Sequence, residues 1–335
     1  MKSFFDKDNY IKGSETFLLT HLNQYQFVLG SDLDFFAKDS DTFSADNPCN
    51  IYFVLARPRV TVDPNSVKIH DKVINLSFIA HNPEDKQQID LSFEFRKAKS
   101  KLEFKSSYPH NVFQIFDGQN FIFGGRPGTI IDSSIALNNS DVEYLDYDVL
   151  YIGQSYGANG ERMAIDRLKS HETVQRIFAD ASANNPDFDI WFMLANFEQI
   201  SVVMNLPDSL RGDRVPLRSE DVSNPGIDGE RALSIDEKQM LNFTEAALIN
   251  YFKPAYNVMF KNNFPSKSHK SYQDCYNFDL KALFLELDTS ENSRKIYTDY
   301  AKRTDYHTKM FEFNSDEDRI SLLNFATRIS DQKIK

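Results

Sequence analysis

Four side chains whose types suit phosphodiester chemistry lie in the middle of the chain: Tyr151, Arg167, His171 and Glu245. A carboxylate is the ligand that a hard divalent cation prefers, and such an ion keeps most of its waters. An arginine can meet a phosphate with two parallel hydrogen bonds as charge builds in the transition state. A tyrosine or histidine can position the attacking water or take its proton. These residue types favour metal-dependent hydrolysis of a phosphodiester.

Two predicted helices carry three of these residues. Arg167 and His171 are spaced i,i+4 in a segment whose apolar stripe predicts a helix over about 163–179. A lone histidine on such a stripe is usually a core residue, and an arginine at its edge usually a surface residue. Glu245 weakens that interpretation, because it interrupts the apolar stripe of a second predicted helix over about 235–252. A carboxylate there is costly to bury without a cation or a metal, which favours a functional role.

The segment before the first helix predicts a hairpin. EYL at 143–145 and LYI at 150–152 read as strands joined by a four-residue loop, and this register places Tyr144 beside Tyr151 on one face. A tyrosine pair in a sheet is most often simply packed. We nevertheless predict that Tyr151, the arginine, the histidine and the glutamate converge on one concave surface, with Tyr144 close by.

These motifs and their order resemble the GIY-YIG nuclease superfamily, which includes homing endonucleases, excision-repair incision domains and some restriction enzymes. Tyr151-Ile152-Gly153 is similar to the family's YIG strand, and RLKSH at 167–171 to the R-x-x-x-H of its first helix. EAALINYFKPAYN at 245–257 resembles the late motif, which contains a metal-binding glutamate, a proline and a structural asparagine, here Asn257. The likeness covers roughly residues 141–260.

The resemblance implies DNA as the substrate and one Mg²⁺ or Mn²⁺ ion held by Glu245, with Gly153 and Asn257 supporting the site. It also implies a three-stranded antiparallel sheet flanked by helices, with strands near 142–145, 149–154 and 188–195. The GIY half is absent as written, and Glu143-Tyr144-Leu145 is its substitute, closer to YIG than the family usually shows. The loop before Arg167 is longer than usual, which makes Arg162 a rival for the arginine's role.

The periodicity of the chain changes near residue 141. In IDLSFEF, at 89–95, apolar residues alternate with polar ones, which predicts an antiparallel sheet with one solvent-exposed face. We therefore predict an α+β chain whose β-rich antiparallel N-terminal domain covers 1–135. A GIY-YIG-like α/β domain over 136–265 would follow, with a polar insertion at 206–234, and then a C-terminal extension over 266–335.

The charge balance limits the partners. The chain has 335 residues and a formal net charge of -11, so the whole molecule repels nucleic acid at long range and binding DNA needs a local basic patch. One stretch has no acidic residue between Glu245 and Asp274, and its lysines are candidates for DNA contact: Lys253, Lys261, Lys267 and Lys270. A second basic segment, 96–105, reads as a solvated face. The β-rich N-terminal domain could contact a protein partner.

Targeting signals are not evident in the sequence. It has no run of about 18 apolar residues, and MKSFFDKDNY lacks a basic segment followed by an apolar one. Cys49 and Cys275 lie far apart without a CxxC or Cys/His pattern, which argues against a disulfide framework and a zinc site. We expect a cytoplasmic protein that does not enter a membrane.

Three interpretations stay open. The residues favour a metal-dependent DNA endonuclease whose flanking regions select the target. A catalytically inactive GIY-YIG-like module in a binding or assembly protein is the first alternative, favoured by the acidity and the missing GIY. The second is an unrelated α/β scaffold in which Glu245 and Arg167 form an ion pair.

Overall fold

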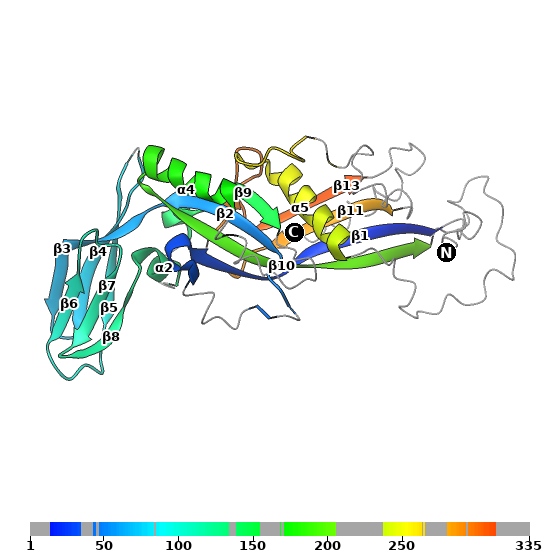
Figure 1. Cartoon of the computed structure of the whole chain (residues 1–335). Coiled ribbons are helices and arrows are strands. Elements are labelled where there is room, and N and C mark those ends of the chain that lie inside the picture. Colours follow the sequence, from blue (N-terminus) through cyan, green and yellow to red (C-terminus); the bar gives the residue numbers. More distant parts are fainter. Residues whose placement is uncertain are drawn as a thin grey trace, which may run out of the picture.

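The computed structural model describes most of the chain, and Figure 1 shows its arrangement. The described residues are 14–34, 43–44, 47–83, 85–133, 139–154, 168, 171–205, 237–262, 264, 280–292 and 294–312. They form an α+β structure dominated by antiparallel strands, so the predicted fold class is confirmed. No helix in the described residues is long and apolar enough to cross a membrane.

The largest element is a seven-stranded sheet with the order β12-β9-β2-β10-β1-β11-β13. Neighbouring strands are antiparallel except for the pairs β1–β11 and β9–β12, which are parallel. The strands are β1 (Ser14–Leu29), β2 (Ile51–Pro58), β9 (Tyr147–Gln154), β10 (Phe188–Asn205), β11 (Leu280–Asp288), β12 (Ile296–Tyr297) and β13 (Tyr306–Glu312). A short 3-10 helix, η2 (Gly30–Asp32), follows β1.

Strand β2 lies inside this sheet, and all eight of its residues are buried. Successive side chains point to opposite faces, so Ile51 and Phe53 belong to one core and Tyr52 and Val54 to the other. Helix α5 (Glu237–Phe252) packs into the first core, and α4 (Glu172–Asn184) into the second. The two helices therefore cover opposite faces, which explains why β2 reads as a continuous apolar run rather than an alternation.

A small β-sandwich connects β2 to β9. It consists of two three-stranded sheets, β3-β4-β5 and β6-β7-β8, which share one apolar core. The strands are β3 (Val60–His70), β4 (Val73–Ala80), β5 (Gln87–Glu94), β6 (Leu102–Ser106), β7 (Phe113–Asp117) and β8 (Asn120–Gly125). Two short helices, α2 (Pro127–Asp132) and η3 (Asn139–Leu145), lead back to the large sheet. Figure 1 shows the sandwich at one end of the molecule, away from α5.

The boundaries between the parts of the fold differ from the predicted domain boundaries. Strands β1 and β2, from the predicted N-terminal domain, lie in the same sheet as β9 and β10, and so do β11 to β13 from the predicted C-terminal extension. The compact β-rich unit is therefore an insertion over 59–146 rather than a domain that ends at 135. Its strand β5 alternates as expected, with Ile89 buried between exposed neighbours. The polar segment 206–234 lies outside the described residues.

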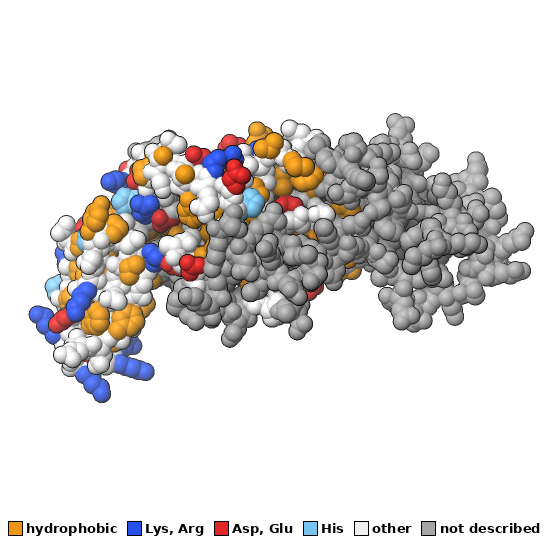
Figure 2. Space-filling model, in the orientation of Figure 1, with side chains coloured by type: hydrophobic (Ala, Val, Ile, Leu, Met, Phe, Trp, Pro, Cys, Tyr) orange, Lys and Arg blue, Asp and Glu red, His pale blue; other side chains and the backbone are white. Residues whose placement is uncertain are grey.

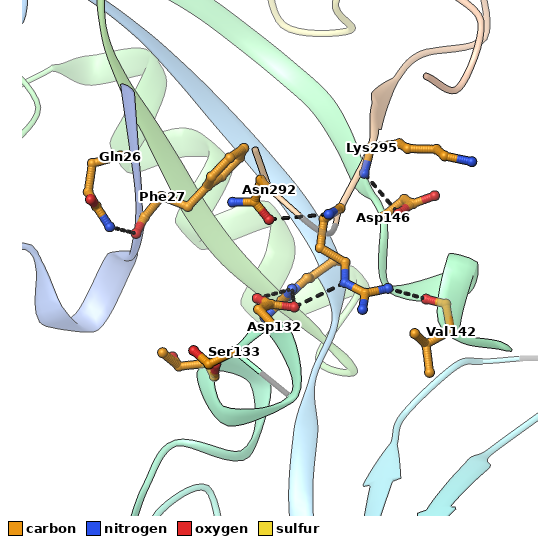
Figure 3. Close-up of polar contacts among 11 residues, drawn as sticks. Gln26, Phe27, Asp132, Ser133, Val142, Asp146, Asn292 and Lys295 are labelled. Carbon is orange, nitrogen blue, oxygen red and sulfur yellow. Dashed lines mark hydrogen bonds and ion pairs between the residues drawn. The ribbon is translucent and has the colours of Figure 1, made fainter. Parts of the chain in front are cut away.

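A buried ion cluster ties the sandwich to the large sheet (Figure 3). Asp132, at the end of α2, accepts two hydrogen bonds from Arg57 Nη1, at 3.1 and 2.8 Å, and one from Arg294 Nε at 3.1 Å. Arg294 Nη1 also donates to the carbonyl oxygen of Val142 at 3.0 Å. Both arginine side chains are only 1% exposed. One carboxylate thus joins β2, the sandwich and the segment before β12.

Candidate active site

The strand beside the YIG residues is β2. Tyr151 pairs with Val54, Ile152 with Phe53, and Gly153 with Tyr52, in antiparallel register. An Ile51-Tyr52 dipeptide thus lies next to Tyr-Ile-Gly, where the sequence predicts Glu143-Tyr144-Leu145. The three strands β9-β2-β10 form an antiparallel set inside the larger sheet.

Three aromatic rings gather on the face that α4 covers. The ring centroids of Tyr52 and Tyr151 are 6.2 Å apart, and the ring of His171 lies 6.4 Å from Tyr52 and 5.5 Å from Tyr151. Tyr52 is fully buried, whereas Tyr151 and His171 are half-buried. Tyr151 and His171 are therefore the rings of the cluster that solvent partly reaches.

Gly153 makes room for the Tyr52 ring. A Cβ atom at position 153 would lie 2.5 Å from the Tyr52 hydroxyl oxygen, 2.6 Å from its Cζ and 2.9 Å from Cε1 of Tyr151. These separations are shorter than van der Waals contact allows, so any larger residue at 153 would displace the rings. The glycine after Tyr-Ile is thus explained by the close approach of β2's tyrosine.

Asn257 holds the YIG strand in place. Its Oδ1 accepts a hydrogen bond from the backbone N–H of Ile152 at 2.9 Å, and its Nδ2 donates to the carbonyl oxygen of Ile152 at 2.8 Å. The backbone N–H of Tyr256 donates to the carbonyl oxygen of Leu150 at 3.0 Å. The segment after α5 thereby satisfies backbone groups of β9 as a neighbouring strand would. This is the kind of structural role that the resemblance implied for Asn257.

Glu245 belongs to the helix that covers the other face of the sheet. It is half-buried on α5, and Asn242, three residues earlier, accepts a hydrogen bond from Gln154 Nε2 at 2.6 Å. Residues three apart lie on the same side of a helix, so Glu245 lies one turn beyond this anchor. Gln154 directly follows Gly153. The glutamate helix is therefore fixed close to the end of the YIG strand, while the ring cluster lies under α4 on the opposite face.

The start of α4 differs from the prediction. The expected helix over 163–179 would include His171, but α4 begins at Glu172 and His171 has extended backbone angles. An acidic residue in the first turn is favourable there because it faces the positive end of the helix dipole. Arg167 and its rival Arg162 lie outside the described residues. Leu168 is 2% exposed and belongs to the core beneath α4.

Tyr144 does not lie in a strand. The expected hairpin is wrong, because residues 139–145 form the helix η3, and Val142 and Leu145 are buried in the sandwich core. Tyr144 packs against that same core, and burial raises the pKa of its hydroxyl. The tyrosine beside Tyr151 is Tyr52. It stands far upstream of YIG, in the apolar run of β2, where the sequence does not distinguish it from its neighbours.

Two of the four candidate DNA-binding lysines are described. Lys253 Nζ lies 5.4 Å from the centre of the Tyr300 ring and 3.4 Å from Asn262 Oδ1. Lys261 Nζ donates to the carbonyl oxygen of Ala255 at 3.2 Å. Both lysines flank the segment that contains Asn257. The other two, Lys267 and Lys270, lie outside the described residues.

The described residues contain no group of three or more His, Cys, Asp or Glu side chains that could hold a metal ion. Glu245 offers a single carboxylate, which fits a magnesium-type ion that keeps most of its waters. The likeness to GIY-YIG nucleases thus depends on short motifs and on the strands around them. Comparisons of the chain with family models, curated proteins and solved structures give no match.

Proposed function

We propose that this protein is a metal-dependent DNA endonuclease with a GIY-YIG-like site. The observation that carries the proposal is the antiparallel pairing of Ile51-Tyr52 with Tyr151-Ile152-Gly153, which gathers Tyr52, Tyr151 and His171 within 6.4 Å of one another. Gly153 and Asn257 support this arrangement for identifiable steric and hydrogen-bonding reasons.

Each side chain has a role in the proposed reaction. Tyr151 or His171 would orient the attacking water or take its proton, because they are the accessible members of the ring cluster. Tyr52 is a positioning residue that supports both from behind. Arg167 would meet the scissile phosphate as its negative charge grows.

Glu245 would hold one Mg²⁺ or Mn²⁺ ion. A bound divalent cation lowers the pKa of its water and offsets charge on the phosphate. The lysines after α5, Lys253 and Lys261, would contact the DNA backbone beside the site. A cytoplasmic location and a protein partner on the β-rich part of the chain belong to the same proposal.

One observation favours the alternative of a catalytically inactive module. Tyr52 is fully buried, and Glu245 extends from a helix that covers the opposite face of the sheet from Tyr151 and His171. In this alternative, the rings are part of a packed core, and the protein acts by binding. The net charge of -11 agrees with a partner other than DNA.

A plasmid-nicking assay with Mg²⁺ or Mn²⁺, with and without EDTA, separates the two functions. Glu245→Gln is expected to abolish cleavage, because an amide coordinates a divalent cation poorly. Glu198→Gln is the matched control, because Glu198 is 56% exposed on β10 and is paired with His21. Arg167→Ala is expected to lower turnover even at saturating metal.

Thermal melts without metal complete the test. If the protein is an endonuclease, we expect Glu245→Gln and Arg167→Ala to change the melting temperature little, because the carboxylate repels its surroundings when no metal is bound. If both variants melt far below the parent and the parent cleaves neither DNA nor RNA, the two residues have a structural role, for which breaking a buried ion pair costs about 3–5 kcal/mol, and the protein is not an enzyme.

A further inference from the structure

The sheet β6-β7-β8 has an inner and an outer face. Leu102, Phe113 and Ile115 point into the sandwich core. The register pairs Glu103 with Phe116, so these side chains lie on the other side of the sheet. We call this side the outer face. It belongs to the insertion between β2 and β9 and does not contain any residue of the candidate active site.

The outer face carries two adjacent phenylalanines. Phe116 on β7 pairs with Phe121 on β8, and their ring centroids are 6.0 Å apart in an edge-to-face arrangement. Phe121 is 57% exposed, and its neighbour Ile122 is 37% exposed. Phe116 is half-buried, and an aromatic pair with one exposed ring beside an exposed isoleucine is typical of binding surfaces rather than of a solvated sheet face.

Lysines surround this aromatic pair. Lys105 extends across the outer face, with its Nζ 4.5 Å from the centre of the Phe116 ring. The carboxylate of Asp117 accepts backbone N–H bonds from Lys99 at 2.8 Å and Ser100 at 2.5 Å. These hydrogen bonds hold the connection before β6 against the β7–β8 turn. At the same turn, the backbone N–H of Gly118 donates a hydrogen bond to the carbonyl oxygen of Lys101 at 3.4 Å. Lys99 and Lys101 are exposed at this end of the sheet.

This part of the chain also differs in charge from the rest. Residues 95–116 contain five lysines and arginines and one acidic residue, whereas the whole chain has a net charge of -11. Arg96 is paired with Glu94 at 3.0 Å, but Lys101 and Lys105 form no ion pair with any described residue. Figure 2 shows Lys and Arg side chains gathered at the free end of the sandwich, beside hydrophobic ones. A local basic patch on an acidic protein is a site for a polyanion.

We propose that the outer face of β6-β7-β8 binds single-stranded nucleic acid. Bases would stack on Phe121 and Phe116, and phosphates would be held by Lys99, Lys101 and Lys105. Stacking on aromatic side chains beside lysines is the physical basis of binding to single strands, since every base has a π-face. A duplex keeps its bases inside and could use only the lysines. This inference does not depend on the proposed nuclease activity.

The first experiment compares nucleic acids. Binding of the full-length protein to a fluorescein-labelled mixed-sequence 20-mer is measured by anisotropy in EDTA, with the same sequence as a duplex in parallel. We expect the single strand to bind at least about fivefold more tightly than the duplex. Contacts to about three phosphates predict a slope of log K against log salt of about -2.

Variants separate stacking from charge. Phe121→Ala is expected to weaken binding at least about fivefold, and Phe121→Tyr to retain it. The double change Lys101→Gln and Lys105→Gln should weaken binding and flatten the salt dependence. Its control is Lys302→Gln with Lys309→Gln, which removes the same charge from exposed positions outside the sandwich and should leave binding unchanged. Because Phe121 is exposed, its truncation should leave the melting temperature within a few degrees of the parent.

Several results would overturn the inference. Equal affinity for single strand and duplex, or a loss of affinity in the lysine variant without one in Phe121→Ala, would reduce the surface to a non-specific basic patch. Absence of any nucleic-acid binding would also reject it. If sedimentation then shows self-association that Phe121→Ala abolishes, the outer face is a contact between copies of the chain.

Discussion

Replacing Asp132 by alanine should destabilise the fold by about 3–5 kcal/mol. Its carboxylate accepts hydrogen bonds from Arg57 and Arg294, whose side chains are each 1% exposed. Without it, two buried guanidinium groups would lose the carboxylate that they share, and only the charges of Asp189 near Arg57 and of Asp146 near Arg294 would remain. Arg57 would retain contact with the ring of Trp191, at 4.1 Å, but a cation–π contact offsets only about 1–2 kcal/mol of the lost stabilisation.

The measurement is urea denaturation followed by tryptophan fluorescence. The chain has one tryptophan, and Trp191 lies against Arg57, so the signal reports on the cluster itself. Glu94→Gln is the control, because the Arg96–Glu94 pair is 82% and 50% exposed, lies away from the cluster and should contribute little. A loss below about 1 kcal/mol for Asp132→Ala would show that the cluster does not hold the sandwich to the sheet.

Three further changes test other parts of the structure. Gly153→Ala should lower the free energy of unfolding by about 1–3 kcal/mol. Tyr52→Phe in the same chain should restore part of this loss, because it removes the oxygen that the new methyl group meets. If Gly153→Ala leaves the free energy of unfolding unchanged, the close approach is refuted. Burial lowers the pKa of His307 to about 4, below its unfolded value, so the stability that the neutral ring provides is complete above about pH 6.5 and is lost as the pH falls toward 4. His307→Gln should therefore be less stable than the parent at pH 7 but lose less stability between pH 7 and 4.5, as measured by urea denaturation at each pH. Burial raises the pKa of Asp148 to about 6, so its ionisation costs stability as the pH rises from about 4 through 6. Asp148→Asn should consequently gain on the order of 2 kcal/mol at pH 7.5 and nothing at pH 3.5, and an equal effect at both values would contradict this reasoning.

The sequence predicts the individual helices and strands of this fold better than it predicts which strands pair with one another. The alternation in β5 and the apolar stripe of α5 follow from residues close together in the chain, and both elements occur where expected. The prediction for Tyr144 failed because consecutive strands usually pair, which made a hairpin the natural interpretation. The true partner, β2, is buried on both faces and has no alternation that would mark Tyr52 as different from its neighbours. Only the tertiary pairing of β2 with β9 identifies it.

The sandwich explains how the two halves of the site can be so far apart in sequence. Strands β2 and β9 are antiparallel neighbours, so the end of β2 lies beside the start of β9. A connection of any length whose two ends lie close together can join them, and here the connection is residues 59–146. Extending a flexible four-residue turn to that length would cost only about 3 kcal/mol of loop-closure entropy. The insertion reduces this entropy cost because it has its own apolar core. In addition, Asp132, near its C-terminal end, accepts a hydrogen bond from Arg57 of β2. The pairing of Tyr52 with Gly153 therefore depends on the large sheet and the ion cluster rather than on a short turn, which makes Asp132 a remote determinant of the candidate site.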